Sequence, residues 1–176
     1  MTRGLRGLLD RSWWAALGAV AAVAAVVWLA WPSPGLPADP AAATRQYLNL
    51  TACLLTGARG VAANPAAAAW SGLRDSSLAT RARVSYLPVF GPATRAAALP
   101  YLASLLQRHC AVVVAVGAAP DAAVAADAAR FPDVRFFAVS AAAQAAHVTR
   151  ISAPSARQVR AAVSAAVTGA VRQVHG

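Results

Sequence analysis

The sequence contains neither Lys nor Glu, and only three His and two Cys occur among its 176 residues. His109, His147 and His175 are far apart, and neither Cys stands in a Cys–His spacing typical of a metal site. The segment Gly57-Ala58-Arg59-Gly60 lacks the Lys-Ser/Thr of a phosphate-binding loop, and the Gly-x-Ser-x-Gly motif of hydrolases is missing. We therefore expect no enzymatic activity, no metal and no cofactor.

Charged residues are also scarce, and most of them are basic. Only 12% of the residues are charged. The chain has 16 Arg and six Asp, which gives a net charge of +10. An apolar content of 59% excludes a disordered or acidic chain, and the length suits one domain with a short appendage. Arg and aromatic residues do not cluster together, so we expect no nucleic-acid partner. An evenly scattered Arg surface is favoured, and attraction of an Arg-rich face to anionic lipid or cell-envelope polymer is the alternative.

The N-terminal part has the pattern of a membrane anchor. Arg3, Arg6 and Arg11 precede residues 13–31, an uncharged run of 19 residues with Trp at both ends. This length nearly spans a hydrocarbon core, and the three Arg predict a cytoplasmic N-terminus. We expect a single-pass cell-membrane protein whose bilayer contact is residues 13–31. A cleaved signal peptide is the alternative.

Four regions follow from this interpretation. Residues 1–12 form a basic cytoplasmic N-terminus, 13–31 the transmembrane helix, 32–43 a Pro/Ala-rich linker, and 44–176 an extracytoplasmic α/β domain. Leu50-Thr51-Ala52-Cys53 matches the lipobox of bacterial lipoproteins, but about twenty residues separate it from the apolar run. We therefore do not expect Cys53 to be lipidated.

Strand and helix patterns alternate through the domain. This alternation predicts a doubly wound parallel sheet of four to five strands. Helix 65–77 should begin with Asn64 as its N-cap, and Pro100 should either start or kink the helix that reaches Arg108. The predicted strands are 52–56, 83–89, 111–116 and 134–139, with a short fifth at 147–151, and the other predicted helices are 120–131 and 154–174.

The two cysteines fall on predicted neighbouring strands. Cys53 lies four residues before Gly57, whereas Cys110 lies seven before Gly117. If the glycines are level, the cysteines are about 10 Å apart along the strands and point to opposite faces. Two buried thiols are therefore favoured over a Cys53–Cys110 disulfide, which would require a bulge or a third strand that begins after Cys110.

Several segments resemble the basic membrane protein family of substrate-binding lipoproteins. They are Ala115-Val116-Gly117, the passage Arg130-Phe131-Pro132-Asp133-Val134-Arg135-Phe136, Leu54-Leu55-Thr56-Gly57, Trp70-Ser71-Gly72-Leu73 and Ala146-His147-Val148-Thr149. The resemblance covers roughly residues 50–165, and the Phe-Pro-Asp-Val block is its most specific part. It implies a type 1 periplasmic-binding-protein fold, in which two lobes clasp a ligand, often a nucleoside, for an ABC importer.

The sequence departs from that family where ligands bind. The loop at residues 61–66 has neither the aromatic ring nor the acids of the family, and Ser140 stands where the family has a ribose-binding Asp. Gly176 falls where the family would begin its second lobe. The ligand-binding candidates are therefore Thr56, Gly57, Gly117 and Ser140, at the carboxyl ends of the strands.

Two functions stay open. One is a membrane-anchored single lobe that retains weak recognition of a nucleoside-like solute, after dimerising to complete a cleft. The other is a non-binding interaction module whose cleft face or sheet edge contacts an envelope protein.

Overall fold

The computed structural model describes residues 47–140 and 145–175. They belong to the second of the two units into which the chain divides, Arg45–Gly176. Among these residues, no helix is both long and apolar enough to cross a membrane. The predicted anchor at residues 13–31 and the predicted linker at 32–43 lie outside the described residues and stay predictions.

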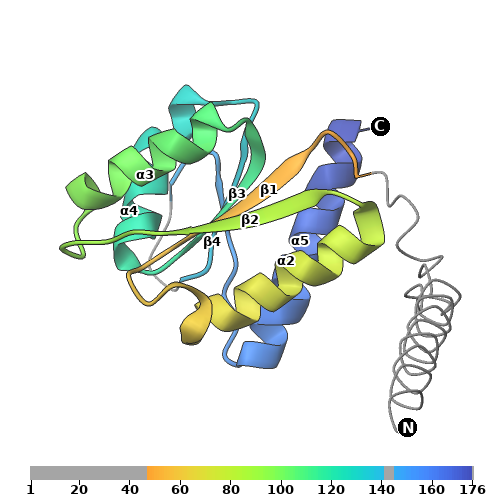
Figure 1. Cartoon of the computed structure of the whole chain (residues 1–176), viewed down its shortest axis with the longest axis horizontal. Coiled ribbons are helices and arrows are strands. Elements are labelled where there is room, and N and C mark those ends of the chain that lie inside the picture. Colours follow the sequence, from red (N-terminus) through yellow and green to blue (C-terminus); the bar gives the residue numbers. More distant parts are fainter. Residues whose placement is uncertain (1–46, 141–144, 176) are drawn as a thin grey trace, which may run out of the picture. The chain divides into compact units, whose positions relative to one another are not determined.

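The described chain builds a parallel sheet of five strands in the order β2-β1-β3-β4-β5 (Figure 1). The strands are β1 (Thr51–Thr56), β2 (Arg83–Pro88), β3 (Cys110–Val116), β4 (Arg135–Ala138) and β5 (Val148–Arg150). Their ends lie within one residue of the predicted ones, and β1 lies beside β3 as expected. The α/β class with a doubly wound parallel sheet is confirmed, and the strand order reverses between β1 and β3.

Four helices cover the two faces of this sheet (Figure 1). They are α2 (Ala66–Thr80), α3 (Arg95–Gln107), α4 (Ala118–Asp127) and α5 (Ala156–His175), with short 3-10 turns η1 (Gly60–Ala62) and η2 (Ala128–Arg130). The helices α2 and α5 pack on one face, and α3 and α4 pack on the other. Each face of the sheet is therefore shielded from water, as a parallel sheet requires.

Alternation along the strands divides the core into two layers. In β1, Leu54 packs into the layer under α2 and α5, whereas Leu55 packs into the layer under α3 and α4. The predicted stripe of α5 is confirmed, because the four valines that form it are buried: Val159, Val163, Val167 and Val171. The apolar run of β3 is buried on both sides, which explains why it carries no polar residue.

The starts of α4 and α5 lie two residues from the predicted ones, and α2 and α3 begin differently from what the sequence predicted. Pro65, not Asn64, occupies the N-cap position of α2, and no side chain caps this helix. Helix α3 begins at Arg95, where Thr94 caps it by accepting a hydrogen bond from the backbone N–H of Ala97. Pro100 therefore lies inside α3 and does not start it. The helix tolerates Pro100 in its interior, and Thr94 caps its start six residues upstream.

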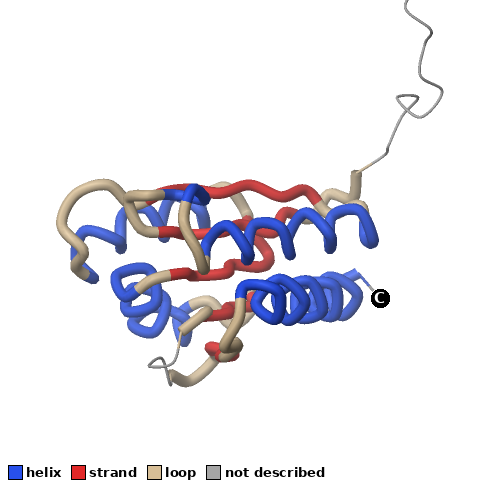
Figure 2. Tube along the Cα trace, turned by 90° about the horizontal axis from the view of Figure 1, so that it is seen from below, coloured by secondary structure: helices blue, strands red, loops and turns tan. Residues whose placement is uncertain are grey.

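The helices α2 and α5 lie side by side, as Figures 1 and 2 both show. Gly72 marks their closest approach, because a Cβ atom there would lie 2.5 Å from the carbonyl oxygen of Arg160 and 3.0 Å from Cβ of Val163. A side chain at position 72 would force the two helices apart.

Cys53 and Cys110 form a disulfide, which corrects the expectation of two buried thiols. The predicted offset of three residues is present, because Cys53 pairs with Val113 in the β1–β3 ladder. The ladder is irregular at its start, however: Thr51 pairs with Cys110 and Ala52 with Val112, so that Ala111 is an extra residue. This bulge brings the two cysteine Cα atoms to 5.9 Å and both side chains into the same core layer.

Candidate functional site

The four predicted ligand-binding residues all lie at the carboxyl edge of the sheet. Thr56 is the last residue of β1 and pairs with Val116, the last residue of β3, so Gly57 and Gly117 follow at the same level. Ser140 follows the carboxyl end of β4. This edge includes the point between β1 and β3 where the strand order reverses, which is where ligands bind in open α/β sheets.

A pocket of ≈ 280 Å³ opens at this point. Its walls are the loop Gly57–Gly60, residues 63–66 at the start of α2, and Val116 with Gly117. It contains two of the four predicted residues, but its only charged side chain is that of Arg59, and it has no aromatic ring. A pocket just below the usual size for small molecules, with so few polar groups, cannot by itself hold a nucleoside tightly.

Three glycines line the pocket, and the two that were predicted as ligand-binding residues, Gly57 and Gly117, differ in what their positions require of the backbone. Gly117 adopts a φ of 113° at the N-cap of α4, a conformation that L side chains rarely adopt. Its backbone alone therefore explains this glycine. Gly57 has no such requirement, because a Cβ atom there would meet nothing within 4 Å. The open space beside Gly57 is part of the pocket and leaves its backbone accessible.

Thr56 and Ser140 do not line the pocket but carry hydroxyl groups that have no hydrogen-bond partner. Thr56 is fully buried, and its Oγ1 is unsatisfied. The Ser140 Oγ is buried and unsatisfied too. Buried polar atoms without a partner are rare and costly in folded proteins, so each indicates strain or a missing contact.

Asp121 completes this group, and the sequence analysis did not identify it. It lies in the first turn of α4, only 5% of it is exposed, and neither carboxyl oxygen has a hydrogen-bond partner. Burial raises the pKa of its carboxyl from 3.8 to about 6. The nearby Ser140 hydroxyl opposes this rise in pKa, although no hydrogen bond of good geometry joins the two side chains.

The buried side-chain atoms that lack a partner gather at this edge in the part of the chain that the structure describes. In residues 47–140 and 145–175, the buried side-chain nitrogen and oxygen atoms that lack a partner belong to Thr56, Asp121 and Ser140 alone. A ligand that donates hydrogen bonds could satisfy the Asp121 carboxylate, and the start of α4 tolerates its negative charge. The same part of the chain holds no cluster of three His, Cys or Asp side chains for a metal.

A short-range signal for Asp121 does exist in the sequence. Asp121 lies four positions after Gly117, the glycine that ends a buried strand, and Pro120 precedes it at the start of a helix. An acid at this spacing must lie at the carboxyl edge of the sheet. Its burial, however, depends on neighbouring elements that no local pattern specifies.

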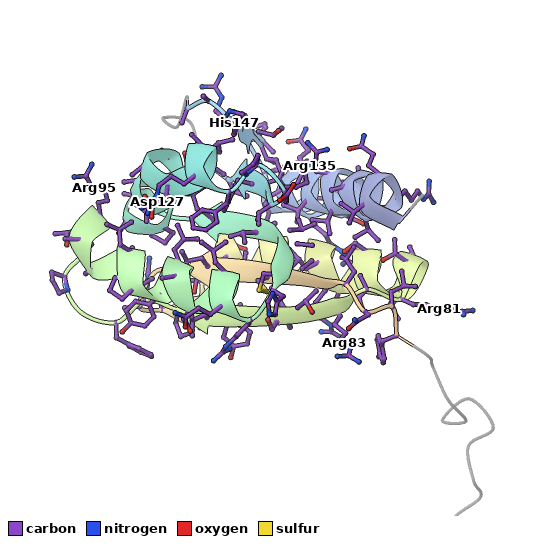
Figure 3. All side chains as sticks on the ribbon, turned by 90° about the horizontal axis from the view of Figure 1, so that it is seen from above. Arg81, Arg83, Arg95, Asp127, Arg135 and His147 are labelled. Atoms are coloured by element: carbon purple, nitrogen blue, oxygen red, sulfur yellow. A yellow bond between two sulfur atoms is a disulfide. The ribbon has the colours of Figure 1, made fainter. Side chains whose placement is uncertain are left out.

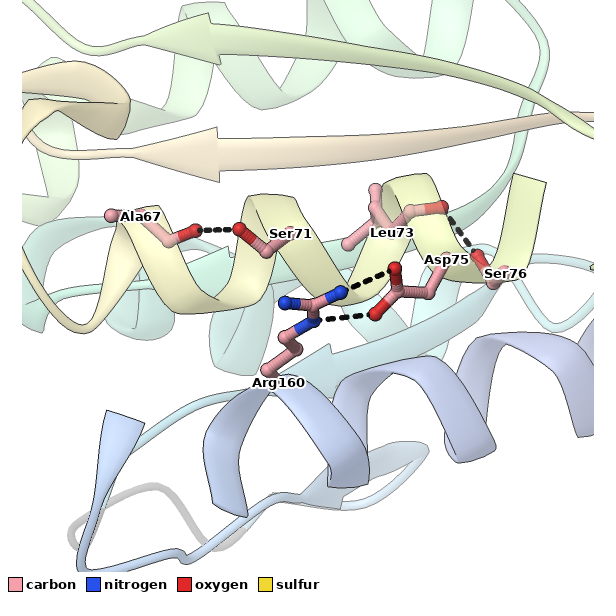
Figure 4. A network of polar contacts seen from close by, with 6 residues as sticks. All are labelled: Ala67, Ser71, Leu73, Asp75, Ser76 and Arg160. Atoms are coloured by element: carbon pink, nitrogen blue, oxygen red, sulfur yellow. Dashed lines mark hydrogen bonds and ion pairs between the residues drawn. The ribbon is translucent and has the colours of Figure 1, made fainter. Parts of the chain in front are cut away.

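A second hollow lies away from this edge, on the outer surface of α2 and α5. Its volume is ≈ 670 Å³, and Asp75 and Arg160 meet beside it through two hydrogen bonds of 2.6 and 2.8 Å (Figure 4). The hydrogen bond from Arg160 lowers the pKa of Asp75, and that of Arg160 rises correspondingly. Because these groups are exposed and paired with each other, the hollow has the character of an ordinary helix–helix surface.

Comparison with known proteins shows a likeness of fold. No protein-family model matches the chain, and no curated protein matches it. A solved structure that it resembles is that of a "putative lipoprotein" from Peptoclostridium difficile 630, determined as a fragment. The TM-score is 0.52 at 14% identity, over 72% of this chain and 99% of that chain.

At this identity the likeness shows the α/β fold alone. It gives no support to membership of the basic membrane protein family, which therefore rests on the quoted segments only.

Proposed function

We propose that the chain is a membrane-associated, extracytoplasmic α/β module without enzymatic activity. The observation that carries this proposal is the buried disulfide between Cys53 and Cys110. Disulfides persist in secreted, periplasmic and cell-surface proteins, whereas reducing systems keep cytosolic thiols free. A domain with such a bond is therefore expected on the outer side of the cell membrane.

Two further observations support this location. Arg3, Arg6 and Arg11 precede the uncharged run at residues 13–31, which is the pattern of an anchor with a cytoplasmic N-terminus. The similar structure from Peptoclostridium difficile 630 carries the description of a lipoprotein, a class of protein held at the membrane surface. The proposal gives this chain a transmembrane anchor in place of a lipid.

Within this module we place weak recognition of a small solute at the carboxyl edge of the sheet. The pocket beside Gly57 and Gly117 supports it, and the buried, unsatisfied carboxyl of Asp121, which does not line that pocket, lies near the same edge. The segments that resemble the basic membrane protein family make a nucleoside-like solute the class to test. With one lobe and no aromatic ring in the pocket, binding should be weak.

The alternative function is an interaction module for an envelope protein or a second copy of the chain. The exposed aromatic side chains of the edge strand β2 and the loop after it favour this function. Tyr86 is 44% exposed and Phe90 is 62% exposed, and the outer edge of β2 pairs with no other strand among the described residues.

Protease digestion of spheroplasts tests the location. The intact full-length protein should lose its domain to added protease, while a cytoplasmic control protein survives. In the same cells, alkylation without reductant should yield a linked Cys53–Cys110 peptide. A protected domain with two alkylated thiols would overturn the proposal.

A further inference from the structure

One end of the domain combines exposed Arg with exposed apolar side chains. We name it the basic end, and its members are Tyr47, Leu78, Arg81, Arg83, Arg172 and Val174. They come from the first described residues, the last turns of α2 and α5, and the start of β2. A hydrogen bond from Leu48 N–H to Arg81 C=O joins the first described residues to the C-cap of α2, and the pairing of Thr51 with Arg83 joins the start of β1 to the start of β2.

The topology of the sheet places the C-terminal ends of α2 and α5 at the same end of the domain. Both α2 and α5 return from the carboxyl edge of the sheet and pack along each other, so their last turns lie near the start of β1. Figure 3 shows Arg81 and Arg83 at the end of the domain where the described chain begins, with Arg95 at the opposite end. Figure 1 shows the C-terminal end of α5 beside the start of β1.

The apolar members of the basic end are unusually exposed. Tyr47 is 50% exposed, Leu78 66% and Val174 47%, and they are three of the five large apolar side chains that are exposed in the described residues. An exposed Tyr and aliphatic side chains interspersed with Arg are typical of surfaces that lie in the headgroup region of a bilayer. The acid nearest along the helices, Asp75, is already paired with Arg160.

The predicted anchor precedes the basic end in the sequence. Residue 47 lies 16 positions after residue 31, the end of the predicted anchor, and it enters the domain at the basic end. A tether of this length keeps the domain at a high effective concentration at the bilayer surface. The carboxyl edge, with the pocket beside Gly57 and Gly117, lies at the other end of β1 and β3.

We propose that the basic end docks onto the anionic headgroups of the membrane that anchors the chain, with Arg81, Arg83 and Arg172 as the contacts to lipid phosphate. This docking turns the carboxyl edge away from the bilayer and leaves the pocket open to solutes and partners. It rests on the proposed anchor for its location, but the surface itself can be tested in isolation.

Vesicle co-sedimentation tests the surface. Residues 45–176 suit this assay, because both core layers and the disulfide lie within that unit. The domain should bind vesicles made of equal parts phosphatidylcholine and phosphatidylglycerol, and it should dissociate from them as the salt concentration rises. It should not bind vesicles of pure phosphatidylcholine. The triple variant Arg81→Gln, Arg83→Gln, Arg172→Gln should bind on the order of 100-fold more weakly, since each Arg near an anionic surface contributes roughly fivefold.

A second triple variant is the matched control. Arg59→Gln, Arg95→Gln, Arg157→Gln removes the same charge from exposed positions toward the other end of the domain, so its binding should stay within about threefold of the unaltered domain. Equal losses in both triples would show diffuse attraction and overturn the proposal, as would absent binding or equal binding to both kinds of vesicle. A domain that binds vesicles as expected but is protected from protease in spheroplasts would overturn the extracytoplasmic location alone.

Discussion

Replacing Asp121 by Asn should make the domain more stable at neutral pH. Burial raises the pKa of this carboxyl from 3.8 to about 6, so ionising it costs more free energy in the folded state than in the unfolded state. Each pKa unit is worth about 1.4 kcal/mol, and the ionised carboxyl therefore lowers the free energy of unfolding by about 3 kcal/mol at pH 7. The Asp121→Asn variant removes this charge and keeps nearly the same shape.

The pH dependence follows from the direction of the pKa change. The folded-state pKa lies above the unfolded one, so the folded state binds more protons than the unfolded state between about pH 4 and pH 6. The stability that protonated Asp121 confers is fully present below about pH 4 and is lost as pH rises through about 6. Asp121→Asn should therefore match the unaltered domain near pH 4 and exceed it by about 3 kcal/mol at pH 7.

Urea denaturation between pH 4 and pH 8, with the disulfide intact, measures this difference. The control is Asp133→Asn, which alters an exposed carboxyl in the loop before β4 and should leave the difference near zero at every pH. If Asp121→Asn lowers the stability at pH 7, or if its curve runs parallel to that of the unaltered domain, the reasoning is refuted. Either result would mean that the carboxylate has a partner in solution that satisfies its charge.

Three further outcomes can be checked with the same domain. The double variant Cys53→Ala, Cys110→Ala should lose about 4 kcal/mol of unfolding free energy in urea, because the bond spans 57 residues of chain; an unchanged midpoint would contradict this. Gly72→Ala should destabilise by about 1–3 kcal/mol, whereas Gly169→Ala, which meets no atom within 4 Å, should be neutral or slightly stabilising; equal effects would show that α2 and α5 separate freely. Calorimetry should give nucleoside dissociation constants weaker than about 100 μM, and sub-micromolar binding would restore the transport-receptor function.

The fold could be predicted because the local sequence pattern of most of its strands and helices is distinctive. The run at residues 111–116 is uncharged and β-branched, which only a strand buried on both faces requires, and the valines of the last helix repeat at its period. The disulfide could not be predicted, because it depends on Ala111. Nothing in its type distinguishes an alanine that is extra in a ladder from one that pairs, and a single extra residue reverses the face to which Cys110 points.

The site was predicted only as far as topology determines it. Gly57 and Gly117 end their strands and therefore lie at the edge where the pocket opens. Asp121 was missed because one acid in an alanine-rich helix has no periodic signal. Its burial arises where α4 packs against the end of β4 near Ser140, a contact between segments about twenty residues apart.

The unsatisfied carboxyl also separates the two functions that we propose. A buried carboxyl without a hydrogen-bond partner lowers the free energy of unfolding, and this loss serves no purpose in a module that only binds another protein. A solute that donates hydrogen bonds to the carboxyl would restore that stability on binding. If the carboxyl edge recognises a solute, the solute should raise the stability of the unaltered domain at pH 7 and should not raise that of Asp121→Asn. If the domain is only an interaction module for an envelope protein, no solute should distinguish the unaltered domain from Asp121→Asn. The variant that is more stable when empty is thus the one that should respond less to a ligand, and Asp133→Asn should respond like the unaltered domain.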